Sequence, residues 1–134
     1  SDPKSMESVH FAVAKSGAVY QIAEIGFSAM AFPHPEEEPL CRTVRERLAA
    51  PDRYTVSVEF ENEKSGILTI AQYRAGLEVF LSVIDGIRKI YGGFLLDREH
   101  FIGHYEIEPS EAPNCPGIDF PLNRYLADLK KILG

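Results

Sequence analysis

The chain of 134 residues is long enough for one domain, and we expect a single domain over residues 1–134, because 45% hydrophobic and 25% charged residues are typical of a globular protein. No apolar run approaches the roughly 18 residues of a membrane-spanning helix, so we expect no membrane partner. Fourteen Lys and Arg against twenty Asp and Glu give a net charge of -6, which argues against a nucleic-acid partner.

The first predicted element is a β-hairpin over residues 9–22. Apolar residues alternate along residues 9–14, a K-S-G turn signal follows, and an extended pattern resumes at residue 19. His10 stands within this alternation, where a structural histidine with satisfied hydrogen bonds is more typical than a metal ligand.

An acidic loop and a short helix are predicted next. Prolines and three consecutive glutamates mark the loop over residues 33–39, in which His34 is too isolated to be given a role. Apolar residues four apart then predict a short amphipathic helix over residues 40–50.

A strand is predicted over residues 55–61. Its core-facing residues are Val56, Val58 and Phe60. Glu59 and Glu61 share the opposite face, where Glu59 has two interpretations. It is a solvated carboxylate, or it is a general base beside an activated water, with its pKa raised by partial burial and by Glu61.

The clearest predicted element is a helix over residues 70–91. Thr69 and Gln72 have the T-x-x-Q spacing of a capping box, and two glycines at 92 and 93 supply the C-terminal stop. An apolar stripe runs along the helix at steps of three and four residues. Its members are Ile70, Tyr73, Leu77, Phe80, Leu81, Ile84, Ile87 and Tyr91. We expect this helix to lie across a sheet and to form the centre of the core.

The last third of the chain predicts short extended pieces, a loop and a final helix. The extended pieces are expected over residues 94–96, 101–102 and 105–107, followed by a proline-bearing loop over 109–116. Leucines at helical spacing predict an amphipathic helix that ends the chain at residue 134. This order of strands and helices predicts an α/β fold.

His104 and Cys115 are candidate metal ligands. Zinc sites use nitrogen and sulfur ligands of this kind, and a strand and a loop can bring two such residues to one ion. From the spacing alone, a polar histidine at a strand edge and a small buried cysteine are favoured over a zinc site. His100 precedes His104 by four residues, a spacing of helical ligand pairs, but Gly103 and the aromatic residues nearby favour a strand, so we interpret that pair as accidental.

Five segments of the chain, taken in order, resemble the zinc-dependent N-acetylmuramoyl-L-alanine amidases, the family of phage lysozyme-type amidases and peptidoglycan recognition proteins. They are S-V-H-F-A-V-A-K-S-G-A-V-Y-Q, V-S-V-E-F-E-N, T-I-A-Q-Y-R-A-G-L, H-F-I-G-H-Y-E-I-E-P and N-C-P-G-I-D-F-P. The likeness covers nearly the whole chain. Its most specific piece is G-H-Y-E-I-E-P followed by C-P-G and F-P, which resembles the family's segment with two zinc ligands.

The resemblance implies roles for three residues. His104 and Cys115 would be zinc ligands, and Glu59 would be the glutamate beside the water that zinc activates. The family's first zinc ligand is a histidine on a strand before the hairpin, and because the chain begins close to the hairpin we expect that strand to be missing from it. The resemblance assigns no substrate-binding residue, since the chain has no tryptophan and has Pro113 in place of the family's frequent lysine.

The implied activity is hydrolysis of the amide between N-acetylmuramic acid and L-alanine of the peptidoglycan stem peptide. The implied cofactor is Zn²⁺, the partner is peptidoglycan or a muropeptide, and the fold is a central mixed β-sheet flanked by helices. The resemblance favours a location of the protein at the cell wall, after secretion or release by a phage, over a location in the cytoplasm. Two alternatives remain: a non-catalytic peptidoglycan-binding domain of the same fold, and a small inhibitor or immunity module, which the acidic balance suggests.

Overall fold

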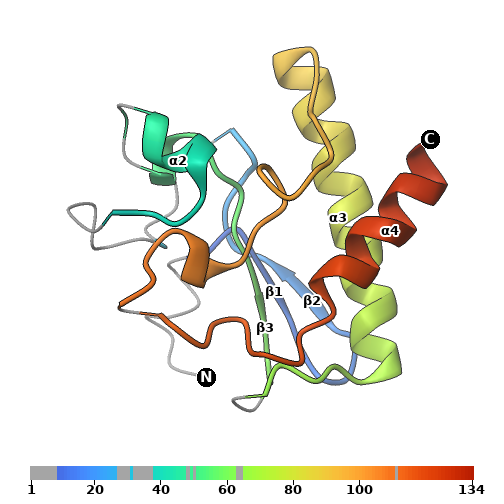
Figure 1. Ribbon diagram of the computed structural model, residues 1–134. Coiled ribbons are helices and arrows are strands. Elements are labelled where there is room, and N and C mark those ends of the chain that lie inside the picture. Colours follow the sequence, from blue (N-terminus) through green and yellow to red (C-terminus); the bar gives the residue numbers. More distant parts are fainter. Residues whose placement is uncertain are drawn as a thin grey trace.

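A computed structural model describes residues 9–26, 31, 38–47, 49, 51–62, 65–110 and 112–134. The strands are β1 (Phe11–Val13), β2 (Val19–Gln21) and β3 (Val58–Phe60). The α-helices are α2 (Arg42–Glu46), α3 (Ile70–Tyr91) and α4 (Leu122–Leu133), and short 3₁₀ turns occupy Pro51–Arg53 and His104–Glu106. In Figure 1, α3 and α4 lie side by side against one side of the sheet, and α2 lies on the other side. The part of the chain that the structure describes is therefore a mixed α/β fold.

The three strands form a mixed sheet in the order β2-β1-β3. β1 runs antiparallel to β2, with Phe11 opposite Gln21, and parallel to β3, with Phe11 opposite Val58. The predicted hairpin and the mixed sheet are confirmed. β3 is shorter than the strand predicted over residues 55–61. Just before it, the regular pairing is interrupted, because the Ser57 carbonyl accepts from both the His10 and the Phe11 N–H at 3.1 Å.

The helix α3 begins and ends where the sequence predicts. Thr69 and Gln72 form both hydrogen bonds of the capping box, and Gly92 takes the left-handed conformation, with φ of 85°, that ends the helix. The predicted apolar stripe is partly wrong, because Ile70 and Tyr91 are 74% and 66% exposed. The buried residues of the helix are Gln72, Gly76, Val79, Val83 and Ile84.

This shift of the buried face has a physical cause. The line facing the sheet includes a glutamine and a glycine, which a search for apolar residues passes over. Gly76 allows close packing, since a Cβ there would lie 2.6 Å from Cε2 of Phe60 on β3. The neighbouring face of α3 packs against α4, where the rings of Tyr73 and Tyr125 stack with centroids 4.2 Å apart.

The main core lies between the sheet and α3. Its buried residues are Phe11, Val13, Val79 and Val83. Val56, Val58 and Phe60 pack against this cluster, as the alternation of the strand predicts. The amphipathic helix predicted at the end of the chain is also confirmed as α4, which buries Tyr125, Leu126 and Leu129. Glu59 consequently lies on the side of β3 that turns away from the core.

The segment after α3 differs from its prediction. None of the extended pieces expected over residues 94–96, 101–102 and 105–107 joins the three-stranded sheet in the described part of the chain. Instead, the Glu106 carboxylate accepts from the main-chain N–H of Gly103 at 2.7 Å, and residues 104–106 form a 3₁₀ turn. This local bond folds the segment back on itself, so its main chain is not presented to a neighbouring strand.

A second, smaller core lies under α2. It contains Cys41, Val44 and Ile107, with Tyr54 and Ile102 packed against it. The helix is shorter than the one predicted over residues 40–50, because Arg47 is already extended. Most of the loop predicted over 33–39, His34 included, lies outside the described residues. Across the described ranges, no helix combines the length and the apolar character needed to cross a bilayer.

Candidate active site

Glu59, His104 and Cys115 all line one cavity of about 990 Å³. They reach it from three different parts of the chain: β3, the 3₁₀ turn at residues 104–106, and the loop before α4. The cavity thus brings together the three residues that the sequence analysis selected.

Glu59 is exposed by area, yet the atoms at the cavity wall remove water from its carboxyl group. This partial burial raises the pKa of Glu59 above its ordinary value. The prediction that Glu61 also raises the pKa of Glu59 is not confirmed. Glu61 is absent from the cavity wall, and its Oε1 accepts from the main-chain N–H of Lys15 at 2.8 Å. A raised pKa brings a carboxyl group closer to the range in which it can both take and return a proton near neutral pH.

His104 lies in the 3₁₀ turn and not at the start of a strand. Its Nε2 lies 2.6 Å from Oε1 of Glu108, a residue that the sequence analysis missed. Glu108 is 1% exposed. The i, i+4 spacing of a histidine and a glutamate was visible in the sequence, but it indicates a contact only where the chain turns as it does here, with the main-chain N–H of Glu108 bonded to the His104 carbonyl at 3.0 Å.

Cys115 is exposed, so the alternative of a small buried cysteine is wrong for this residue. Desolvation of the sulfur raises the pKa of the thiol, and the negative charge of Glu59 raises it further. Both side chains line the same cavity. A main-chain hydrogen bond of 3.0 Å from Tyr105 N–H to the Cys115 carbonyl also joins the two segments that carry the candidate ligands.

An ion pair braces the segment that carries His104. Nη2 of Arg98 lies 3.0 Å from Oε1 of Glu106, and Nη1 of Arg98 lies 3.2 Å from Oε2 of the same carboxylate. Nη1 also donates to the main-chain carbonyl of Phe101 at 2.8 Å. Because both ends of this pair are largely shielded, with side chains 33% and 15% exposed, the two-pronged contact holds residues 98–106 in a fixed loop.

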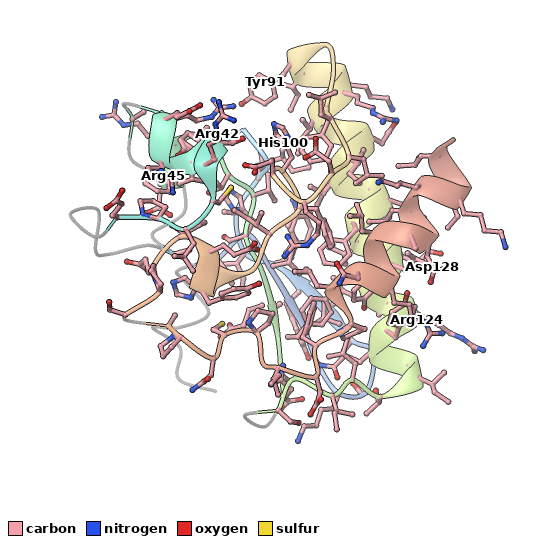
Figure 2. All side chains as sticks on the ribbon, in the orientation of Figure 1. Arg42, Arg45, Tyr91, His100, Arg124 and Asp128 are labelled. Atoms are coloured by element: carbon pink, nitrogen blue, oxygen red, sulfur yellow. The ribbon has the colours of Figure 1, made fainter. Side chains whose placement is uncertain are left out.

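The other two described histidines do not join the candidate ligands. His100 lines the same cavity and lies between α2 and α3 in Figure 2, but its Nδ1 is 2.6 Å from Oδ1 of Asp97. His100 and His104 therefore have separate carboxylate partners, as expected if their spacing is accidental. His10 is buried, and its Nδ1 accepts from the main-chain N–H of Ser57 at 3.1 Å, as a structural histidine should.

The donor chemistry of His104 and Cys115 fits zinc, which binds imidazole nitrogen and thiolate sulfur. Within the described ranges, however, no group of three or more His, Cys, Asp or Glu residues is gathered closely enough to hold a metal ion. The candidate centre therefore consists of two side chains of zinc-binding type, His104 and Cys115, and the carboxyl group of Glu59, all on the wall of one cavity.

Comparisons of the chain with protein-family models, with curated proteins and with solved structures give no match.

Proposed function

We propose that the chain is a zinc-dependent N-acetylmuramoyl-L-alanine amidase domain, which hydrolyses the amide between the lactyl group of N-acetylmuramic acid and L-alanine. The observation that carries the proposal is that Glu59, His104 and Cys115, which the sequence resemblance selects, line one cavity of about 990 Å³. A cavity of several hundred cubic ångströms is the usual size for binding a small ligand, so a muramoyl-peptide fragment has room to enter.

Glu59 is the proton carrier in this proposal. Its carboxylate takes a proton from the attacking water while the oxygen of that water bonds to the amide carbon. The C–N bond then breaks, and the same carboxyl group returns the proton to the departing nitrogen of L-alanine. The raised pKa of Glu59 supports both halves of this cycle, because a carboxyl group with an ordinary pKa holds a proton poorly at neutral pH.

His104 and Cys115 would hold the zinc. When bound, zinc supplies Lewis-acid polarisation of the scissile carbonyl and acidifies a water molecule. The contributions of the chain are to set the two donor side chains on one wall, through the bond between Tyr105 and Cys115, and to brace their loop, through Arg98 and Glu106.

The test is cleavage of purified cell walls by the chain with zinc in excess, measured as newly exposed amino groups of L-alanine. We expect cleavage that a chelator abolishes and that zinc restores. His104→Ala and Cys115→Ser should each abolish it. His100→Ala is the matched control, because His100 is a histidine on the same cavity wall and should leave cleavage within a few fold of the unmodified chain.

The non-catalytic alternative predicts a different result in the same experiment. A peptidoglycan-binding domain would sediment with the cell walls and release no amino groups at any zinc concentration. A chain that neither sediments with cell walls nor cleaves them would contradict both functions and would favour the inhibitor or immunity module.

A further inference from the structure

The strand β3 has an open edge. Among the described residues, the sheet order β2-β1-β3 gives it a neighbouring strand on one side only. The Ser57 carbonyl and the Glu61 N–H both bond to β1, at 3.1 Å and 2.9 Å. Because the C=O and N–H of one peptide unit point in opposite directions, the Val58 N–H and the Phe60 carbonyl point away from β1. Such an edge is a template for pairing with another extended segment.

This edge forms one wall of the cavity. Residues 54–60 line the cavity without a gap. Side chains of a strand alternate between two faces, so a cavity that touches every residue in turn runs along the edge. Residues 99–104 and 112–116 line the same cavity, and in Figure 1 β3 is the strand nearest to the 3₁₀ turn at residues 104–106. The edge is thus recessed behind loops, and a single extended segment fits it better than the sheet of a second folded copy.

Helix α3 supplies an apolar surface beside the edge. Phe80, Val83 and Ile84 line the cavity, and Val58 and Phe60 of β3 pack against the same core. Neighbouring positions on adjacent strands point their side chains to the same face of a sheet. Alternate side chains of a segment beside β3 would therefore meet α3 and should be apolar.

The side chains in between would lie on the face to which Glu59 belongs. The carboxyl group of Glu59 and the net charge of -6 favour polar or basic side chains there. The cavity volume of about 990 Å³ is at the upper end of the usual range for ligand cavities, which suits a chain segment several residues long.

We propose that the edge of β3 binds an extended peptide segment of a partner protein, which pairs with the main chain of Val58 and Phe60 and alternates apolar with polar or basic side chains. In this mode of recognition the main-chain hydrogen bonds give affinity and the alternate side chains give specificity. The inference goes beyond the proposed function and requires neither a metal nor cleavage.

The first test is binding of a fluorescein-labelled K-T-V-T-V-T-K peptide, measured by fluorescence anisotropy. The control peptide, K-V-V-T-T-T-K, has the same composition without the alternation, so only one of its valines can meet α3. We expect the control to bind about 10-fold more weakly, the effect of leaving one valine in water. Equal binding of the two peptides, or no binding of either, would overturn the proposal.

The second test locates the peptide by amide hydrogen exchange, followed by NMR on the unmodified chain. At a peptide concentration of about 10 times Kd, exchange at the N–H groups of Val58 and Phe60 should slow about 10-fold. Exchange at Val19 and Gln21, on the edge strand β2 at the other side of the sheet, should not change. Slower exchange at β2 in place of β3 would overturn the proposal.

The third test removes one open N–H group. Proline is tolerated at the first residue of a strand, which Val58 is in β3 and Val19 is in β2. Val58→Pro should bind the alternating peptide at least about 5-fold more weakly, the value of one main-chain hydrogen bond. Val19→Pro is the matched control, because the Ala18 carbonyl bonds to Ala14 and the Val19 N–H therefore points away from β1. It should bind the peptide within a few fold of the unmodified chain.

Two further results would overturn the proposal. Equal affinity of Val58→Pro and Val19→Pro, with both variants folded by circular dichroism, would exclude pairing at Val58. Exchange at Val58 that slows with rising protein concentration in the absence of peptide would show that the occupant is a second copy of the chain. If Val58→Pro does not fold, the exchange experiment on the unmodified chain decides the question by itself.

Discussion

The side-chain amide of Gln72 donates to the main-chain carbonyl of Glu61 at 2.6 Å and so ties the first turn of α3 to the end of β3. The same nitrogen donates to the carbonyl of Val13 at 3.1 Å, at the end of β1. Gln72 is fully buried. Since Glu59 is two residues before Glu61, this contact fixes the position of the candidate base relative to the long helix.

We expect Gln72→Leu to lower the free energy of unfolding by about 1 to 3 kcal/mol, the cost of a buried polar group that loses its partner. The Glu61 carbonyl loses the Gln72 donor, whereas the Val13 carbonyl keeps the N–H of Glu61 at 2.9 Å. Urea unfolding measures the change. Gln21→Leu is the control, because Gln21 is exposed on β2 and should alter stability by less than about 0.5 kcal/mol. Equal effects of the two substitutions would contradict the role given to Gln72.

Gly76 permits the close approach of α3 to β3 and α4. A Cβ there would meet the Tyr125 hydroxyl and would lie 2.6 Å and 2.8 Å from two ring carbons of Phe60. Alanine is favoured over glycine within a helix by about 1 kcal/mol, but overpacking a core usually costs about 1 to 3 kcal/mol. We therefore expect Gly76→Ala to lower the melting temperature.

Gly86→Ala in the same helix is the matched control. Among the residues that the structure describes, a Cβ at Gly86 meets the end of the Ile25 side chain alone, at 2.8 Å, and that flexible end can move aside. We expect this variant to be as stable as the unmodified chain or more stable, by up to about 1 kcal/mol. A stabilised Gly76→Ala variant would show that the helix can move away from the sheet.

The elements with strong local signals were predictable from the sequence. The capping box at Thr69 and the glycine at 92 gave both ends of α3, and alternation gave the core-facing side of β3. The buried face of α3 was not predictable, since its central residues include Gln72 and Gly76, whose burial depends on contacts with other elements. The strand pieces predicted between 94 and 107 do not join the sheet in the described part of the chain. Over residues 98–106 the Glu106 carboxylate holds a loop through its contacts with Arg98 and with the main-chain N–H of Gly103.

The candidate site was predictable only in its residue types. Sequence resemblance selected Glu59, His104 and Cys115, and the structure brings them to one cavity wall. The buried partner Glu108 was missed, because burial of a carboxyl group four residues after a histidine depends on the turn at 104–106. Whether His104 and Cys115 bind zinc stays a prediction for the metal-binding experiments.

A contact between α3 and α4 predicts how stability changes at alkaline pH. Tyr73 donates to Asp128, and Figure 2 shows Asp128 and Arg124 projecting from α4. Burial, followed by the contact with Asp128, raises the pKa of Tyr73 to about 12. Because the unfolded tyrosine loses its proton near pH 10, the stability that this phenol provides is present below pH 10 and is lost as the pH rises toward 12.

We expect Tyr73→Phe to lose part of this pH dependence, which urea unfolding at pH 9 and at pH 11 measures. The unmodified chain should lose stability between the two pH values, and Tyr73→Phe should lose less, with the remainder coming from Tyr125, whose pKa is also raised by burial. Tyr20→Phe, at an exposed position on β2, should behave like the unmodified chain. An unchanged pH dependence in Tyr73→Phe would show that the phenol of Tyr73 does not cause the loss of stability at alkaline pH.

The last prediction concerns the candidate base on β3. Glu59→Gln keeps the size of the side chain but removes its ability to take a proton, and loss of a general base typically lowers the rate by about 10²-fold to 10⁴-fold. We expect at least a 10²-fold loss of peptidoglycan cleavage with the melting temperature unchanged within a few degrees, because the side chain faces the cavity and not the core. Glu61→Gln is the matched control: it makes the same charge change just after β3, but Glu61 does not line the cavity and bonds to the main chain of Lys15. It should leave the rate within a few fold.

Two outcomes would contradict this role of Glu59. Full activity in Glu59→Gln would remove the residue from the mechanism. An equal loss in both variants would show that the rate responds to the negative charge in this part of the chain and not to proton transfer by Glu59.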